Sequence, residues 1–177
     1  MSRGEILTRV TIWLAILGYT AGTAAFAFSG NRDKWNAAAR LAWTVACVSL
    51  LAHIACAFHF YHGWSHADAY RDTARQTNEV FGLNWGGGLY VNYALLIGWV
   101  MDTLWWWLRG HNAYRRRPWP LLAAWHGFLI FIIFNATVIF KTGFMRWAGL
   151  CVCLGVCLAW WVAARDSEKY PLTAAEN

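Results

Sequence analysis

The chain has 177 residues, of which 59% are hydrophobic and 14% are charged, whereas ordinary soluble domains are about 45–50% apolar and about 25% charged. Fourteen tryptophans and an aromatic share of 18% fit a membrane protein, because indole rings gather at the two water–lipid boundaries. The formal net charge is +6, but the basic residues stand at the ends of apolar runs, where charges stop or orient membrane helices. The expected partner is therefore the lipid bilayer and not nucleic acid.

Five apolar runs have about the length needed to cross a hydrocarbon core of roughly 30 Å. They cover about residues 10–28, 41–61, 89–108, 121–140 and 147–164. The sequence therefore predicts an all-α integral membrane protein, a bundle of five transmembrane helices that forms a single domain over residues 1–177.

The first run has a second interpretation as a cleaved signal peptide. Arg3 and Arg9 supply a basic start, and Ala25-Phe26-Ala27 resembles a small-residue cleavage site. Against this, the run is long for a signal core, and Gly18 and Gly22 have the small-xxx-small spacing that lets two membrane helices touch.

A polar stretch separates the second and third runs. Ser65-His66-Ala67-Asp68 has the form of a capping box, and Phe81-Gly82 offers a glycine stop. We expect a short surface helix over about residues 66–81, on the outer face of the membrane.

The distribution of Lys and Arg sets the expected orientation, because cytoplasmic loops carry an excess of these residues. Six lie on the side of the N-terminus: Arg3, Arg9, Arg71, Arg75, Lys141 and Arg146. Nine lie on the other side: Arg32, Lys34, Arg40, Arg109, Arg115, Arg116, Arg117, Arg165 and Lys169. We expect an inner (plasma) membrane protein with its N-terminus outside and its C-terminus in the cytoplasm. The dense group at residues 115–117 is interpreted as a membrane-surface anchor.

Histidines provide the clearest chemical signal. The chain has six, and in one continuous helix His59, His62 and His66 would share a stripe. Imidazoles so arranged bind Zn, Cu or Fe, with Asp68, Asp72 or Glu79 as candidate oxygen ligands. Gly63 and Ser65 indicate a helix break before His66, so the alternative is a set of interfacial histidines bonded to water or to backbone carbonyls.

The spacing His59-x-x-His62-x-x-x-His66 is similar to pieces of the histidine boxes in membrane-bound di-iron desaturases and hydroxylases. In those families the histidine boxes hold iron, and the resemblance would imply an iron site here. They use about eight histidines in several boxes, whereas this chain has six histidines and lacks the paired-histidine box. Their activity is therefore not carried over to this chain.

Haem b is the alternative cofactor, with His53 and His126 as the candidate axial ligands within predicted spans. At 1.5 Å rise per residue, His53 lies roughly 18 Å and His126 roughly 9 Å from the inner face. This mismatch disfavours a haem shared between them.

The same depth estimate groups the other polar residues of the predicted spans. Asp102 comes out at roughly 9 Å, level with His126, and the two are predicted to pair. Asn92 and Asn135 come out at roughly 24 and 22 Å, in an outer layer with His53 and His59. Polar groups in lipid are costly and often functional, although such layers can equally be simple helix-to-helix hydrogen bonds.

Two functions remain open at this point. The first is a membrane metalloprotein with a histidine-rich site at its outer face that binds a metal or haem and performs redox chemistry. The second is a non-catalytic membrane subunit or scaffold that packs against a partner membrane protein or another copy of itself, with Gly18 and Gly22 as contacts.

Overall fold

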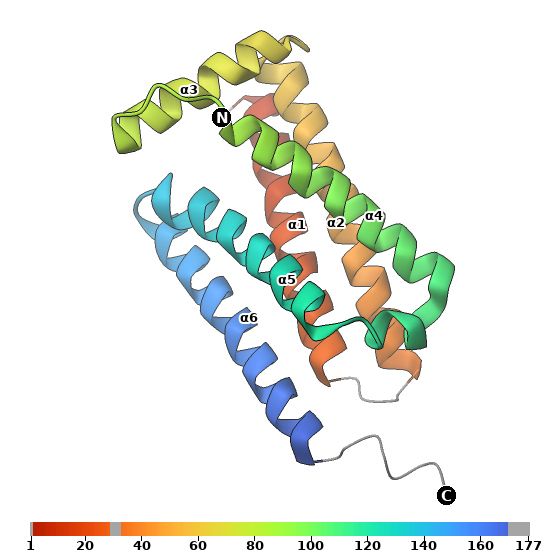
Figure 1. Cartoon of the computed structure of the whole chain (residues 1–177). Helices are drawn as coiled ribbons and strands as arrows, with labels where there is room; N and C mark the ends of the chain where they lie inside the picture. The colour runs from red at the N-terminus through yellow and green to blue at the C-terminus, as the bar shows by residue number, and fades with distance from the viewer. Residues whose placement is uncertain (1, 29–32, 170–177) are drawn as a thin grey trace, which may run out of the picture.

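The fold was obtained as a computed structural model, which describes residues 2–28 and 33–169. The described residues form helices joined by short turns (Figure 1). The helices are α1 (Arg3–Phe28), α2 (Asp33–Tyr61), α3 (His66–Phe81), α4 (Gly88–Arg115), α5 (Trp119–Phe134), the π-helical turn η1 (Asn135–Ile139) and α6 (Phe144–Lys169). The all-α prediction is confirmed.

Four helical segments are long and apolar enough to cross a membrane: Arg3–Phe28, Lys34–Tyr61, Trp119–Ile139 and Phe144–Val162. They correspond to four of the five expected spans, and the last two end at Ile139 and Val162, one and two residues before the expected ends. The other expected span lies in α4, whose mean hydropathy is lower than that of the four segments. Asn92, Asp102 and a run of tryptophans interrupt its apolar residues. The fold is therefore compatible with a membrane protein, with four membrane-length apolar helices in the described part of the chain.

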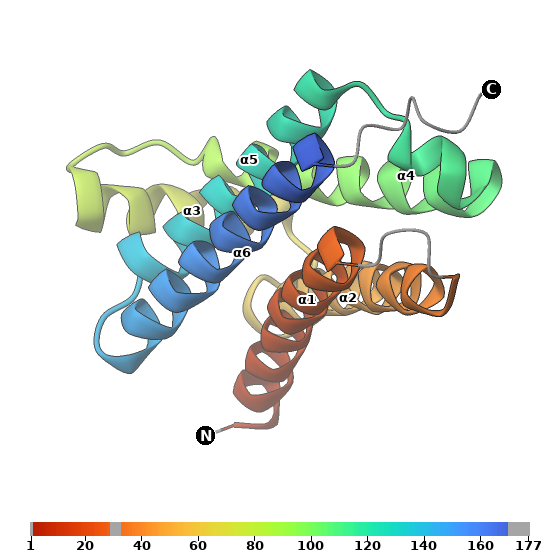
Figure 2. The ribbon, with the colours of Figure 1, turned by 90° about the horizontal axis from the view of Figure 1, so that it is seen from below.

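The helices α1 and α2 form an antiparallel hairpin, α5 and α6 form a second one, and α4 runs along the bundle beside α2 (Figures 1 and 2). The polar helix α3 lies across one end of the bundle, where α1 also begins (Figure 1). We call this the α3 end. The last turns of α6 lie at the opposite end.

Small residues set the close approach of α1 and α2. A Cβ added at Gly18 would lie 2.9 Å from the Ala46 Cβ and 3.0 Å from the Ala42 carbonyl oxygen. A Cβ added at Gly22 would lie 3.2 Å from the Trp43 backbone nitrogen. The close approach that these glycines permit is therefore made within the chain, against α2, and a contact with a partner protein stays a prediction.

The ends of α3 agree with the capping signals of the sequence. The Asp68 N–H donates to the Ser65 Oγ over 3.2 Å, and the helix ends at Gly82, which has a φ of 70° and donates its N–H to the Asn78 carbonyl. Glycine tolerates this left-handed conformation because it has no Cβ. The predicted helix over residues 66–81 is confirmed.

Near its C-terminus, α4 is broken at Gly110, whose φ of 75° and ψ of 179° are not helical. The following turn folds back on the bundle, so that Tyr114 stacks on Trp106 with ring centroids 3.9 Å apart. Arg115 and Arg117 turn inward with it. The Arg115 guanidinium donates to the Phe26 carbonyl over 2.9 Å. The interpretation of the arginine triplet as a surface anchor is thus wrong for these two residues.

Candidate functional site

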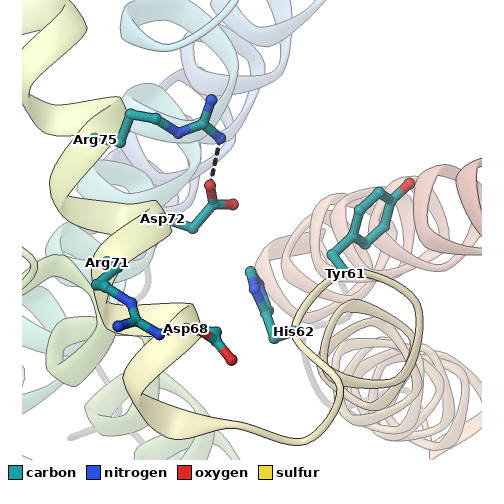
Figure 3. Close-up of a pocket in the computed structure, with 6 residues that line it drawn as sticks. All are labelled: Tyr61, His62, Asp68, Arg71, Asp72 and Arg75. Atoms are coloured by element: carbon teal, nitrogen blue, oxygen red, sulfur yellow. Dashed lines mark hydrogen bonds and ion pairs between the residues drawn. The ribbon is translucent and has the colours of Figure 1, made fainter.

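A polar hollow of about 500 Å³ opens between the end of α2 and the first turns of α3 (Figure 3). Its lining residues are Tyr61, His62, Asp68, Arg71, Asp72 and Arg75. The chain reverses between the two helices through left-handed residues, with φ of 54° at Gly63 and 61° at Trp64. This reversal sets the C-terminal end of α2 opposite the acidic face of α3.

Two carboxylates stand one helical turn apart on the wall that α3 provides. Asp68 pairs with Arg71, and Asp72 pairs with Arg75, each within the helix. Both guanidiniums are mostly exposed, at 74% and 65% of their side chains. Surface ion pairs of this spacing are weak because water screens them, so the arginines hold the carboxylates only loosely.

Charge and hydrogen bonds fix the ionisation of this wall. The hydrogen bond from Arg71 holds the pKa of the Asp68 carboxyl below its usual range, assisted by the hydrogen bond with Ser65 and, more weakly, by His62. The hydrogen bond to Asp72 raises the pKa of Arg75. The Asp68 carboxylate therefore stays anionic at neutral pH.

The opposite wall carries an imidazole. The His62 ring packs edge-on against Phe58, with centroids 5.7 Å apart, and projects from the end of α2 toward Asp68 and Asp72 (Figure 3). A nitrogen donor thus faces two oxygen donors across the hollow.

The other two histidines of the predicted metal site have different surroundings. The His59 ring is exposed and lies against Phe60 at 4.7 Å. His66 lies beyond the end of α2, and its Nδ1 is 3.1 Å from the Tyr93 hydroxyl. Within residues 2–28 and 33–169, no group of three or more His, Cys, Asp or Glu is close enough to hold a metal as it stands. The single stripe is absent, and metal binding by His59, His62 and His66 stays a prediction.

The two candidate haem ligands occupy separate environments. The His53 Nδ1 lies 2.9 Å from the Thr8 carbonyl oxygen, and because a carbonyl only accepts, this nitrogen carries the proton. His126 is buried, with its Nδ1 3.2 Å from the Tyr19 hydroxyl. The cavity beside His126 measures about 10 Å³, whereas sites for large ligands need roughly 300 Å³ or more. The residues around His126 therefore do not fit a haem.

The predicted pair of Asp102 and His126 is wrong, because each has another partner. Tyr114 donates its hydroxyl proton to Asp102 over 2.7 Å, and Arg117 forms an ion pair with the same carboxylate. The depth estimate assumed straight helices, whereas the break at Gly110 returns Tyr114 and Arg117 to the bundle. The one sequence signal for these missed residues is Gly110 itself, a glycine close to the end of an otherwise helical run.

The predicted outer polar layer is likewise not brought together by hydrogen bonds among the described residues. The Asn135 side chain donates to the Phe131 carbonyl of its own helix over 2.8 Å, where the π-helical turn begins. Asn92 is exposed on α4. His53 is already satisfied by Thr8.

The chain matches no protein-family model, no curated protein and no solved structure. Its function is therefore argued from the geometry of the hollow.

Proposed function

We propose that this chain is a membrane metalloprotein that binds a divalent transition-metal ion in the hollow at the α3 end. The observation that carries the proposal is the placement of the His62 imidazole opposite Asp68 and Asp72 (Figure 3). One imidazole nitrogen and carboxylate oxygens form a donor set that Zn, Fe and Cu accept. Of the three histidines predicted from the sequence, His59, His62 and His66, the proposal keeps His62 as a metal ligand.

The two arginines of the hollow are the main argument against a cation. Their ion pairs with Asp68 and Asp72 lie at the surface, where such pairs are weak. His62, Asp68 and Asp72 are not close enough to hold a metal as they stand, so the proposal requires that a metal displace the exposed guanidiniums and draw the two carboxylates toward His62.

The membrane placement belongs to the same proposal. In it, α4 crosses the bilayer as a fifth span beside α2, and the buried carboxylate of Asp102 is tolerated there because Arg117 neutralises it. Five crossings put the termini on opposite sides. The nine-to-six excess of Lys and Arg assigns the α3 end, and with it the hollow, to the outside.

Metal analysis of purified protein tests the proposal. The full chain is stripped with a chelator, equilibrated separately with Zn²⁺, Cu²⁺ and Fe²⁺, and analysed for bound metal. We expect one equivalent of one of these metals in the parent protein, and a loss of at least tenfold in affinity for His62→Ala and for Asp72→Asn. A redox role follows only for Cu or Fe, because Zn²⁺ has no redox chemistry.

Two control variants remove the same types of side chain, an imidazole and a carboxylate, outside the hollow. His59→Ala removes an exposed imidazole outside the hollow, and Glu5→Gln removes a carboxylate on α1 that pairs with Arg9 and does not line the hollow. Both should leave metal affinity within twofold of the parent. Absence of metal from the parent, or equal losses in His59→Ala and His62→Ala, would overturn the proposal. A metal-free protein that co-purifies with a defined membrane partner would favour the non-catalytic subunit instead.

A further inference from the structure

A small cavity of about 10 Å³ lies inside the bundle, where α1, α2, α4 and α5 meet. It is lined by Gly22, Thr23, Phe26, Trp43, Trp106, Tyr114 and His126. The hollow at the α3 end shares none of these residues.

Two buried polar atoms at this cavity, the Thr23 Oγ1 and the Trp43 Nε1, have no partner that meets hydrogen-bond geometry among the described residues, and only 1% of each residue is exposed. The Thr23 hydroxyl interacts with Tyr19 and the Trp43 indole with Asp102, but neither contact has the geometry of a full hydrogen bond. Buried polar groups in folded proteins are nearly always satisfied, either by protein or by ordered water. A bundle interior offers no bulk water to these atoms.

The cavity has the size and the chemistry of a site for one water molecule. A volume of roughly 10–15 Å³ accommodates one water, provided that two to four polar partners surround it. The Trp43 indole can only donate, whereas the Thr23 hydroxyl can donate or accept. Trp43 and Trp106 also line the cavity, which leaves room only for a small molecule.

Polar pairs flank the cavity. His126 belongs to the pair with Tyr19, whose hydroxyl lies 3.2 Å from the Nδ1. Tyr114 belongs to the group with Asp102, to which its hydroxyl donates over 2.7 Å. Because both His126 and Tyr114 line the cavity, a water there would stand between the two groups.

We propose that the cavity binds one ordered water molecule, held by the Thr23 hydroxyl and the Trp43 indole, which connects the His126–Tyr19 pair to the Tyr114–Asp102–Arg117 group. The water accepts a hydrogen bond from the Trp43 indole N–H and forms one with the Thr23 hydroxyl. It can donate a further hydrogen bond to the Tyr114 oxygen, whose own proton is donated to Asp102, and its remaining hydrogen bond is available to the His126 imidazole. It thereby joins four helices through one molecule. The proposal does not depend on a metal at the α3 end.

A high-resolution structure of the detergent-purified chain tests the site directly. We expect solvent density within hydrogen-bond distance of both the Thr23 Oγ1 and the Trp43 Nε1. Thr23→Val keeps the shape but removes the hydroxyl, and should lose the density, whereas Thr23→Ser keeps the hydroxyl and should retain it. A dry cavity in the parent protein would overturn the proposal.

Solid-state NMR gives a second measurement that needs no crystal. With ¹⁵N-labelled tryptophan, magnetisation from water should reach the Trp43 indole N–H, whose signal is assigned by its disappearance in Trp43→Phe. The transfer should be lost in Thr23→Val and kept in Thr23→Ser. Transfer of equal strength in parent and Thr23→Val would show that Thr23 does not hold the water, and would likewise overturn the proposal. If Thr23→Val does not fold, retention of the density in a Trp43→Phe structure refutes the role of the indole.

Discussion

Arg117 forms an ion pair with Asp102, a residue fifteen positions earlier, and only 7% and 8% of the two side chains remain exposed. The pair locks the folded-back turn after Gly110 onto α4. Breaking a buried ion pair by removal of one partner costs about 3–5 kcal/mol, because the other charge stays buried alone.

The first prediction concerns this pair. Asp102→Asn and Arg117→Gln should each lower the unfolding free energy by about 3–5 kcal/mol, and the double variant should cost clearly less than the sum. Thermal unfolding in detergent measures all three. Arg116→Gln, at an exposed neighbouring position, is the control and should change stability by less than about 0.5 kcal/mol. Additive losses would mean that the two charges are not coupled.

The second prediction concerns the α1–α2 hairpin. In Gly18→Ala, the new Cβ would meet Ala46 and the Ala42 carbonyl at 2.9 and 3.0 Å, and overpacking of this kind costs about 1–3 kcal/mol. Gly127 has no atom within 4 Å of an added Cβ, so Gly127→Ala should stabilise the protein by up to about 1 kcal/mol through helix propensity. Thermal unfolding compares the two variants. A stabilised Gly18→Ala protein would contradict the close approach of the helices.

The third prediction is a pH dependence at the N-terminus of α3. Because Arg71 lowers the pKa of Asp68 in the folded chain, the stabilisation from this carboxylate is fully present above the ordinary value of about 3.9. It is lost as the pH falls through the lowered pKa. Carboxyl NMR of ¹³C-labelled aspartate should show Asp68 titrating below its usual range, and Arg71→Gln should move it upward. Arg75→Gln serves as the control, since Arg75 pairs with Asp72 instead. An Asp68 titration that is the same in Arg71→Gln as in the parent protein would refute the assignment.

The fourth prediction concerns orientation. If the α3 end faces outside, Asn78→Cys should react with an impermeant thiol reagent in intact cells, whereas Arg116→Cys should react only after the membrane is opened. Both positions are exposed in the structure. The five native cysteines lie within α2 and α6, and the parent protein supplies their background labelling. The reverse pattern would invert the topology.

Part of the candidate site was accessible from the sequence. His62, Asp68 and Asp72 were all named as candidate ligands, because imidazoles and carboxylates stand out in an apolar chain. Their grouping was not predicted correctly. The expected stripe needed a continuous helix from His59 to His66, whereas the left-handed residues Gly63 and Trp64 reverse the chain between them.

The helical elements can be read from the sequence alone, since their signals are local. Hydropathy over some twenty residues indicated the long helices, and the capping residues Ser65 and Gly82 bounded α3, through hydrogen bonds that reach only three or four positions along the chain. Tertiary structure alone decided the partners. Which way Gly18 faces depends on the rotation of α1 about its axis, and the approach of Arg117 to Asp102 depends on the chain reversal at Gly110. Hydropathy predicts neither the rotation of α1 nor the chain reversal at Gly110. An apolar helix in an apolar surrounding has no polar face that would fix its rotation.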